Sequence, residues 1–186
     1  MYFYRAIFLA SLWAASVFAA ATEPDAPHQT IEWQIWAYST AAPSFIGDNA
    51  TVLDQNNDVL RQGTNGWTCM PANPRGYADP KVGWVDAHDA MPICTDTEGM
   101  KWIQAFYAGK KPVLERDAFA WMLHGDKDPH APYETGPHAM LFPKDVSSIS
   151  AYQTDADDLA LRKGYPTNMM PTMLNGWYAH LMIPLD

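Results

Sequence analysis

Two short apolar segments contain the residues that are best suited to chemistry. One reads Gly-Pro-His-Ala-Met-Leu-Phe-Pro, and the other reads Tyr-Ala-His-Leu-Met-Ile-Pro. In each segment a histidine is followed two positions later by a methionine, His138 by Met140 and His180 by Met182. Because alternate residues of a β-strand point to the same face, each segment would place an imidazole beside a thioether.

The pairing of imidazole with thioether predicts a site for a small ligand or a soft metal. These donors suit copper, Cu(I) above all. Three further thioethers, those of Met169, Met170 and Met173, precede His180. A metal-bound histidine must be neutral, so affinity should fall as the pH drops through about 6.5. The residues expected to bind the ligand or copper are His138, Met140, His180 and Met182.

A structural interpretation of the same two segments competes with the metal site. Methionine fills irregular gaps in protein cores. A histidine in a strand can also be a core residue whose ring bonds to a backbone carbonyl. The metal site requires the two segments to be adjacent strands with their imidazoles close together, so their relative placement separates the two interpretations.

A second candidate site lies in the segment His-Gly-Asp-Lys-Asp-Pro-His, where His124, Asp126 and His130 alternate with other residues. These side chains could supply an acid and a base to an exported hydrolase or redox enzyme. The same composition is typical of an exposed turn. The sequence contains no G-x-S-x-G, H-E-x-x-H or C-x-x-C-H motif, which lowers the expectation of the common hydrolases and cytochromes. We therefore favour a binding protein over an enzyme.

A third alternative is a structural module that binds a glycan or a protein partner. Trp67, Trp84 and Trp177 each follow a glycine. Tryptophans exposed in loops could stack on sugar rings, whereas buried tryptophans would anchor a small core.

The start of the chain predicts export. Residues 1–21 have the pattern of a signal peptide, with Arg5 before an apolar stretch and Ala-Ala-Ala at its end. The apolar stretch is about 13 residues, shorter than the roughly 20 that cross a bilayer. We expect a periplasmic or extracellular protein without a membrane span, with a flexible leader over 22–30 and one globular domain over 31–186.

The charge of the chain argues against nucleic-acid partners. The sequence has 12 basic and 21 acidic residues, and loss of Arg5 with the signal peptide changes the net charge from −9 to −10. An acidic chain without a cluster of lysine and arginine is poorly suited to bind nucleic acid or anionic lipid.

Two cysteines, Cys69 and Cys94, predict a disulfide, because an even pair in an oxidising compartment is usually joined. The bond would tie down the long Pro- and Gly-rich excursion over residues 71–93. Such long loops inside a compact domain are usually functional or disordered, and the disulfide argues against disorder.

Hydrophobic patterns predict an α+β or mainly β fold, with one principal helix packed on an antiparallel sheet of about six short strands. The helix is expected to begin with a capping box at Thr95 and Glu98 and to end at Gly109. The expected strands include 31–37, a hairpin with arms 51–54 and 59–62, 67–70 and 118–123.

Two sequence runs carry a resemblance. Gly-Thr-Asn-Gly-Trp-Thr-Cys precedes Met70, and Gly-Pro-His-x-Met ends at Met140. With these runs the chain resembles uncharacterised exported bacterial proteins. The resemblance implies export and implies no activity.

Overall fold

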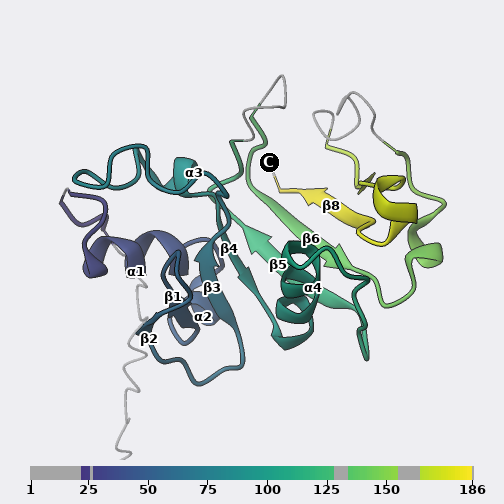
Figure 1. Cartoon of the computed structure of the whole chain (residues 1–186), viewed down its shortest axis with the longest axis horizontal. Helices are drawn as coiled ribbons and strands as arrows, with labels where there is room; N and C mark the ends of the chain where they lie inside the picture. The colour runs from purple at the N-terminus through teal and green to yellow at the C-terminus, as the bar shows by residue number, and fades with distance from the viewer. Residues whose placement is uncertain (1–21, 26, 128–133, 155–163, 186) are drawn as a thin grey trace, which may run out of the picture.

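The computed structural model describes residues 22–25, 27–127, 134–154 and 164–185. Eight strands in these ranges form one sheet in the order β2-β1-β3-β4-β5-β6-β8-β7, which extends from the β1–β2 hairpin to β8 in Figure 1. The strands are β1 (Thr51–Leu53), β2 (Val59–Arg61), β3 (Thr68–Pro71), β4 (Pro92–Thr95), β5 (Ala118–Met122), β6 (His138–Phe142), β7 (Thr167–Met169) and β8 (His180–Pro184).

The helices of the described residues are short. They are α1 (Ile31–Ser39), α2 (Ser44–Gly47), α3 (Ala87–Ala90) and α4 (Thr97–Tyr107), with 3₁₀ turns η1 (Val146–Ile149) and η3 (Met173–Gly176). None of the helices in the described part of the chain is long and apolar enough to cross a membrane. The expected signal peptide, residues 1–21, lies outside the described residues.

The expected α+β or mainly β fold is confirmed, with two differences in the sheet. It has eight strands instead of about six. It is also mixed, because β1 pairs with β3 in parallel while the other neighbouring strands are antiparallel. The expected hairpin is present as β1 and β2, and the expected strand over 118–123 is present as β5.

The prediction of a strand over 31–37 is wrong, because these residues form helix α1. Thr30 caps the helix by accepting a hydrogen bond from the Trp33 backbone N–H at 3.3 Å. Trp33, Ala37 and Tyr38 are buried, which is the spacing of one helical face. The alternation of large apolar residues suggested a strand, but the Thr30 cap and the spacing of four between Trp33 and Ala37 fit the helix.

Helix α4 begins one residue later than the predicted capping box. Its N-cap is Asp96, whose Oδ1 accepts from the Gly99 N–H at 2.9 Å. Thr95 is instead the last residue of β4, and its hydroxyl donates to the Phe119 carbonyl at 2.8 Å. Gly99 lets the helix approach the sheet closely, since an added Cβ would lie 1.8 Å from Thr95 Oγ1.

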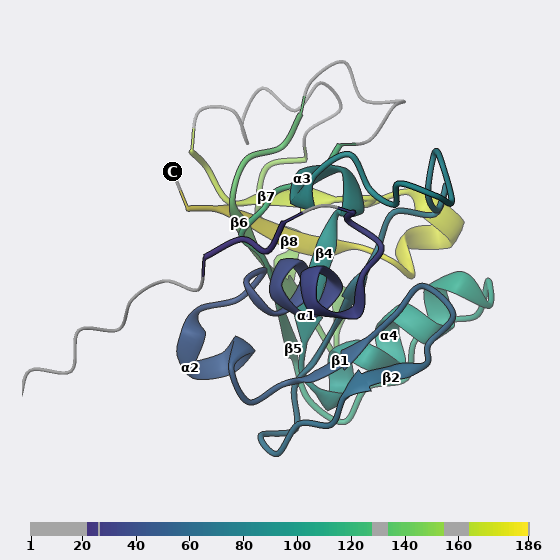
Figure 2. The same ribbon diagram turned by 90° about the vertical axis from the view of Figure 1, so that its left-hand side faces the viewer.

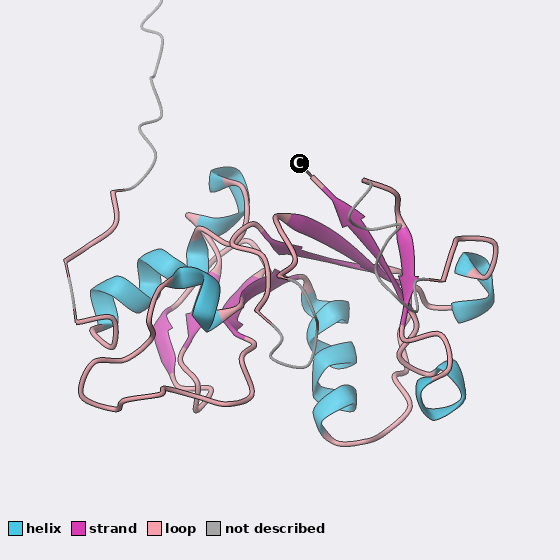
Figure 3. Cartoon of the chain, turned by 90° about the horizontal axis from the view of Figure 1, so that it is seen from above, coloured by secondary structure: helices cyan, strands magenta, loops and turns pink. Residues whose placement is uncertain are grey.

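The two longer helices cover opposite faces of the sheet, as Figure 3 shows from above. Neighbouring residues of β4 belong to different cores: Cys94 packs in the cluster that contains Trp33 of α1, and Ile93 packs in the cluster that contains Trp102 of α4. Because neighbouring strand residues point to opposite faces, the helices must lie on opposite sides. In Figure 2, α1 lies in front of β4 and β5.

The predicted Cys69–Cys94 disulfide is confirmed. The two residues are directly paired across β3 and β4, with their Cα atoms 4.0 Å apart. The excursion between them contains α3 and returns to the sheet at β4.

The expected leader contacts helix α1 through its described residues. The His28 ring stacks on Trp33 with centroids 4.4 Å apart, and its Nδ1 lies 3.0 Å from the Trp84 carbonyl oxygen. The Trp33 indole donates to Glu23 Oε1 at 3.0 Å.

Candidate functional site

The two His-x-Met segments form neighbouring antiparallel strands, β6 and β8. Met140 lies directly opposite Met182, and His138 lies opposite Pro184. Directly opposed side chains have Cβ atoms about 4.5–5.5 Å apart, so the two thioethers are neighbours. On β8, His180 lies four residues before Pro184, the residue opposite His138. Four residues of strand span roughly 13 Å. The two imidazoles therefore lie at opposite ends of the methionine pair.

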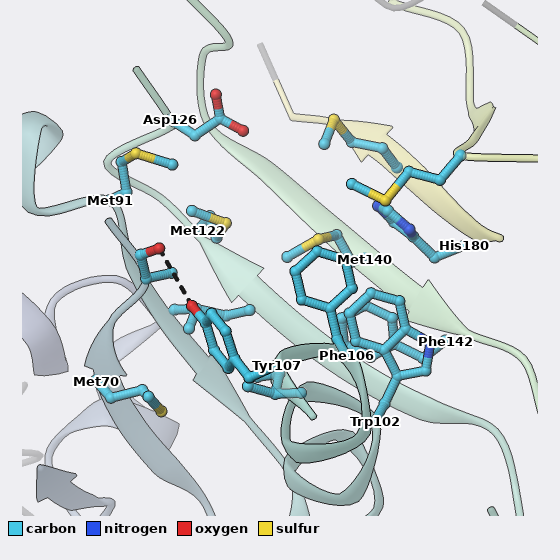
Figure 4. A pocket seen from close by; sticks show the side chains of 15 residues that line it. Met70, Met91, Trp102, Phe106, Tyr107, Met122, Asp126, Met140, Phe142 and His180 are labelled. Carbon is cyan, nitrogen blue, oxygen red and sulfur yellow. Dashed lines mark hydrogen bonds between the residues drawn. The ribbon is translucent and has the colours of Figure 1, made fainter. Parts of the chain in front are cut away.

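A cavity of about 170 Å³ lies between α4 and this face of the sheet. Six of the ten methionines of the chain line it. Figure 4 shows Met140 and His180 facing this space, with Trp102 and Phe142 along one side. The lining methionines are Met70, Met91, Met122, Met140, Met170 and Met182.

The strand register explains why methionines from distant parts of the sequence meet. Met70 is paired with Ile93, and Met122 is paired with His138, so β3 to β6 present these residues on one face. Met140 and Met182 continue that face across β6 and β8. Since alternate strand residues share a face, the sheet aligns the thioethers beneath α4.

Two lining methionines have left-handed backbone conformations. Met91 has φ 49° and Met170 has φ 53°. A residue with a Cβ in this region costs about 1–2 kcal/mol, and such conformations cluster at functional sites. Met91 is the C-cap of α3, where its N–H donates to the His88 carbonyl at 3.1 Å. Met170 is 39% exposed, so it reaches the surface as well as the cavity.

His180 is a buried, neutral imidazole. Its Nδ1 donates to the Tyr178 carbonyl at 2.9 Å, which leaves the lone pair on Nε2. The ring packs edge-on against Trp102 with centroids 5.5 Å apart. Burial is the main cause that lowers the pKa of His180 to about 4. A lowered pKa for this residue would move the expected loss of metal affinity from near pH 6.5 to lower pH.

His138 has the same local geometry as His180 but a different place in the sheet. It is fully buried, and its Nδ1 lies 2.8 Å from the Gly136 carbonyl oxygen, two residues back along the chain. It does not belong to the residues that line the methionine cavity. The structure thus brings Met140, Met182 and His180 to one cavity and leaves His138 at the far end of the strand pair.

Three of the lining methionines were not predicted from sequence. Met70, Met91 and Met122 lie in separate segments, and none of them follows a histidine by two positions as Met140 and Met182 do. Met70 on β3 and Met122 on β5 reach the cavity only because strands β3 to β6 pair in one sheet. The alternation of β5, which buries Ala118, Ala120 and Met122, is a local signal that could have placed Met122 on the inner face.

The second candidate set is divided between two parts of the molecule. His124 Nε2 lies 2.8 Å from the Thr40 hydroxyl, which itself donates to the Trp36 carbonyl and so accepts from the imidazole. Burial is the main cause that lowers the pKa of His124. Asp126 lines the methionine cavity instead. His130 lies outside the described residues.

Among described residues, no group of three or more histidine, cysteine, aspartate or glutamate side chains is arranged to hold a metal ion. Methionine thioethers are donors of another kind, and six methionines line the cavity.

The tryptophans singled out by sequence have mainly structural contacts. Trp84 is fully buried, and its indole N–H donates to the Tyr38 hydroxyl at 2.7 Å. Trp67 packs against the same core in a partly buried position, and Trp177 packs against the core around Trp102. These positions fit core anchors better than a row of exposed sugar-stacking rings.

Comparisons of the chain with protein-family profiles, with curated protein sequences and with solved structures found no match.

Proposed function

We propose that this is an exported protein that binds Cu(I) in the methionine cavity, through Met140, Met182 and His180. The observation that carries the proposal is the convergence of six methionines and one neutral imidazole on a single small cavity. Thioether and imidazole are soft or borderline donors that suit Cu(I), whereas thioether sulfur is a poor ligand for zinc.

The size of the cavity supports an ion over a larger ligand. Its volume of about 170 Å³ is below the roughly 300–1,000 Å³ typical of small-molecule sites. Asp126 is the acidic side chain among the lining residues. A carboxylate at the cavity reduces the cost of placing a monovalent cation among apolar walls.

A second candidate ligand is a small apolar molecule. Aromatic rings of Trp102, Phe106 and Phe142 line the cavity together with the thioethers. An apolar cavity of about 150 Å³ can hold a molecule the size of benzene. Flexible methionines are also common at binding surfaces that accept varied apolar partners.

The test is anaerobic competition for Cu(I) against a chromophoric chelator. The wild type should withdraw copper from the chelator, and the Met140→Leu/Met182→Leu double variant should withdraw much less. Leucine keeps the apolar volume and lacks the sulfur, so this variant should remain folded. Met100→Leu is the matched control, because Met100 is on α4 and does not belong to the cavity lining.

A second pair of variants distinguishes the two histidines. The amide of asparagine can replace the Nδ1–H donor to the backbone carbonyl but has no counterpart of Nε2. His180→Asn should weaken Cu(I) binding more than His138→Asn. If the wild type withdraws no copper, or the double methionine variant withdraws as much as the wild type, the proposal fails. Stabilisation by benzene together with no copper binding would favour the apolar ligand.

A further inference from the structure

A second cleft lies beside the methionine cavity, and Tyr107 lines both. The cleft has a volume of about 440 Å³, within the range of roughly 300–1,000 Å³ that small-molecule sites occupy. It lies between the turn that joins β1 to β2, the loop that follows β3, and the end of α4. Its lining residues include Gln55, Asn56, Asn57, Asn73, Gly76 and Tyr107.

The lining of this cleft is rich in amides and carries no charge. Four of the nine lining residues have side-chain amides, and none of the nine is charged. Each amide offers both donors and an acceptor, which is the combination that pairs with a hydroxyl group. The amides of Gln55 and Asn57 form no hydrogen bond with any other described residue, so both can bond to a ligand.

The turn that presents these amides is held in one conformation. Asp54 Oδ1 accepts from the N–H groups of Asn56 at 2.7 Å and Asp58 at 2.8 Å. Asn57 has φ 67°, a left-handed conformation that asparagine tolerates better than most residues. The turn is therefore ordered before a ligand arrives, which reduces the entropy lost on binding.

The facing wall is also fixed by internal hydrogen bonds. Asn73 is buried, and its amide donates to the Asp89 carbonyl at 2.6 Å while its Oδ1 accepts from the Arg75 N–H at 2.9 Å. Asn73 thus builds the wall. An added Cβ on Gly76 would lie 3.5 Å from Gln55 Oε1, an ordinary van der Waals distance, so Gly76 lies beside the turn.

Tyr107 supplies an exposed aromatic surface beside the amides. The residue is 56% exposed, and its hydroxyl donates to the Ala72 carbonyl at 3.4 Å, the dashed contact in Figure 4. Pro71 and Pro74 add apolar surface to the same cleft. Apolar surface beside uncharged hydrogen-bonding groups matches a pyranose, which has a C–H face and a rim of hydroxyls.

We propose that this cleft binds a neutral oligosaccharide. An acidic saccharide is disfavoured, because the lining offers no cation and the chain has a net charge of −9. A peptide added to the sheet would need the edge of a strand, whereas the amides of Gln55 and Asn57 project from a turn. The cleft is separate from the proposed copper ligands, since Met140, Met182 and His180 do not line it, although Met70 and Tyr107 line both spaces.

The test is saturation-transfer NMR and calorimetry with cellohexaose, maltohexaose and chitohexaose. Oligogalacturonate is the acidic probe, and a neutral Gly-Ser peptide is the peptide probe. Asn57→Gly keeps the left-handed turn and removes the amide, so it should weaken binding about three- to tenfold. Tyr107→Ala should weaken it by about tenfold, and Tyr107→Phe should bind as the wild type does. Gln104→Ala, at an exposed position of α4 outside the cleft, is the matched control.

The proposal is supported if at least one neutral hexasaccharide binds and both Asn57→Gly and Tyr107→Ala weaken it while Gln104→Ala does not. It is overturned if no neutral saccharide binds at millimolar concentration, if binding survives in both variants, or if only the acidic or peptide probe binds. Asn57→Gly should withdraw Cu(I) from the chelator as the wild type does, because Asn57 does not line the methionine cavity. Failure of the saccharide site is therefore distinguishable from failure of the copper site.

Discussion

Acid should destabilise the metal-free protein through His180. In the unfolded chain this imidazole takes up a proton near its ordinary pKa of 6.5, whereas in the folded protein burial lowers its pKa to about 4. Between these values the unfolded state binds more protons, so the free energy of unfolding falls as the pH falls. A shift of this size corresponds to roughly 3 kcal/mol, a large part of the 5–15 kcal/mol typical of a domain.

The assay is urea unfolding of the wild type and His180→Asn at a series of pH values between 7 and 4, with a Cu(I) chelator present. Asparagine does not titrate. Between pH 7 and 4 the free energy of unfolding of His180→Asn should therefore fall by roughly 3 kcal/mol less than that of the wild type. His124→Asn removes a partly buried imidazole whose pKa is also lowered, and it should flatten the curve in the same direction. Parallel curves for the wild type and His180→Asn would refute the argument that burial keeps His180 neutral.

Three further predictions concern the frame that supports the cavity. Gly99→Ala should lower the unfolding free energy in urea by about 1–3 kcal/mol, because overlap with Thr95 outweighs the better helix propensity of alanine; unchanged stability would mean that α4 shifts freely. Asp96→Ala should cost about 1–2 kcal/mol in the same assay, and Asp96→Asn less, since asparagine still caps α4; equal losses would contradict a capping role. Reduction of the Cys69–Cys94 disulfide should lower the free energy of unfolding by about 3–4 kcal/mol, measured by urea unfolding with and without reductant. Equal urea midpoints under the two conditions would contradict a stabilising role for the disulfide.

Local sequence signals predicted the strands that carry the proposed metal donors. The segments around His138 and His180 are apolar runs closed by proline, and they became β6 and β8. The hairpin at 51–62 was predictable from its turn residues. The disulfide followed from the even cysteine count and the expected oxidising compartment. For the strands and the hairpin, the information lies within a few residues of the feature.

Other features depend on contacts that no short segment contains. Residues 31–37 alternate like a strand, but burial of Trp33 and Ala37 against the sheet selects the helix. Met70 and Met122 reach the cavity only because β3 to β6 pair in a particular register. The lowered pKa of His180 likewise depends on burial against Trp102, which comes from α4. Local propensity cannot report such tertiary effects.

The composition of the cavity is hard to explain by packing alone. Leucine has similar volume, has better-defined rotamers and is the more usual choice for a strand face under a helix. Six methionines instead line a space that they leave partly open. Two of them, Met91 and Met170, hold left-handed backbone conformations that a side chain with a Cβ disfavours. Met91 is the C-cap of α3, where a left-handed residue is common, so the number of thioethers at the cavity is what favours a sulfur site. Copper competition by the Met140→Leu/Met182→Leu variant decides between packing and metal binding.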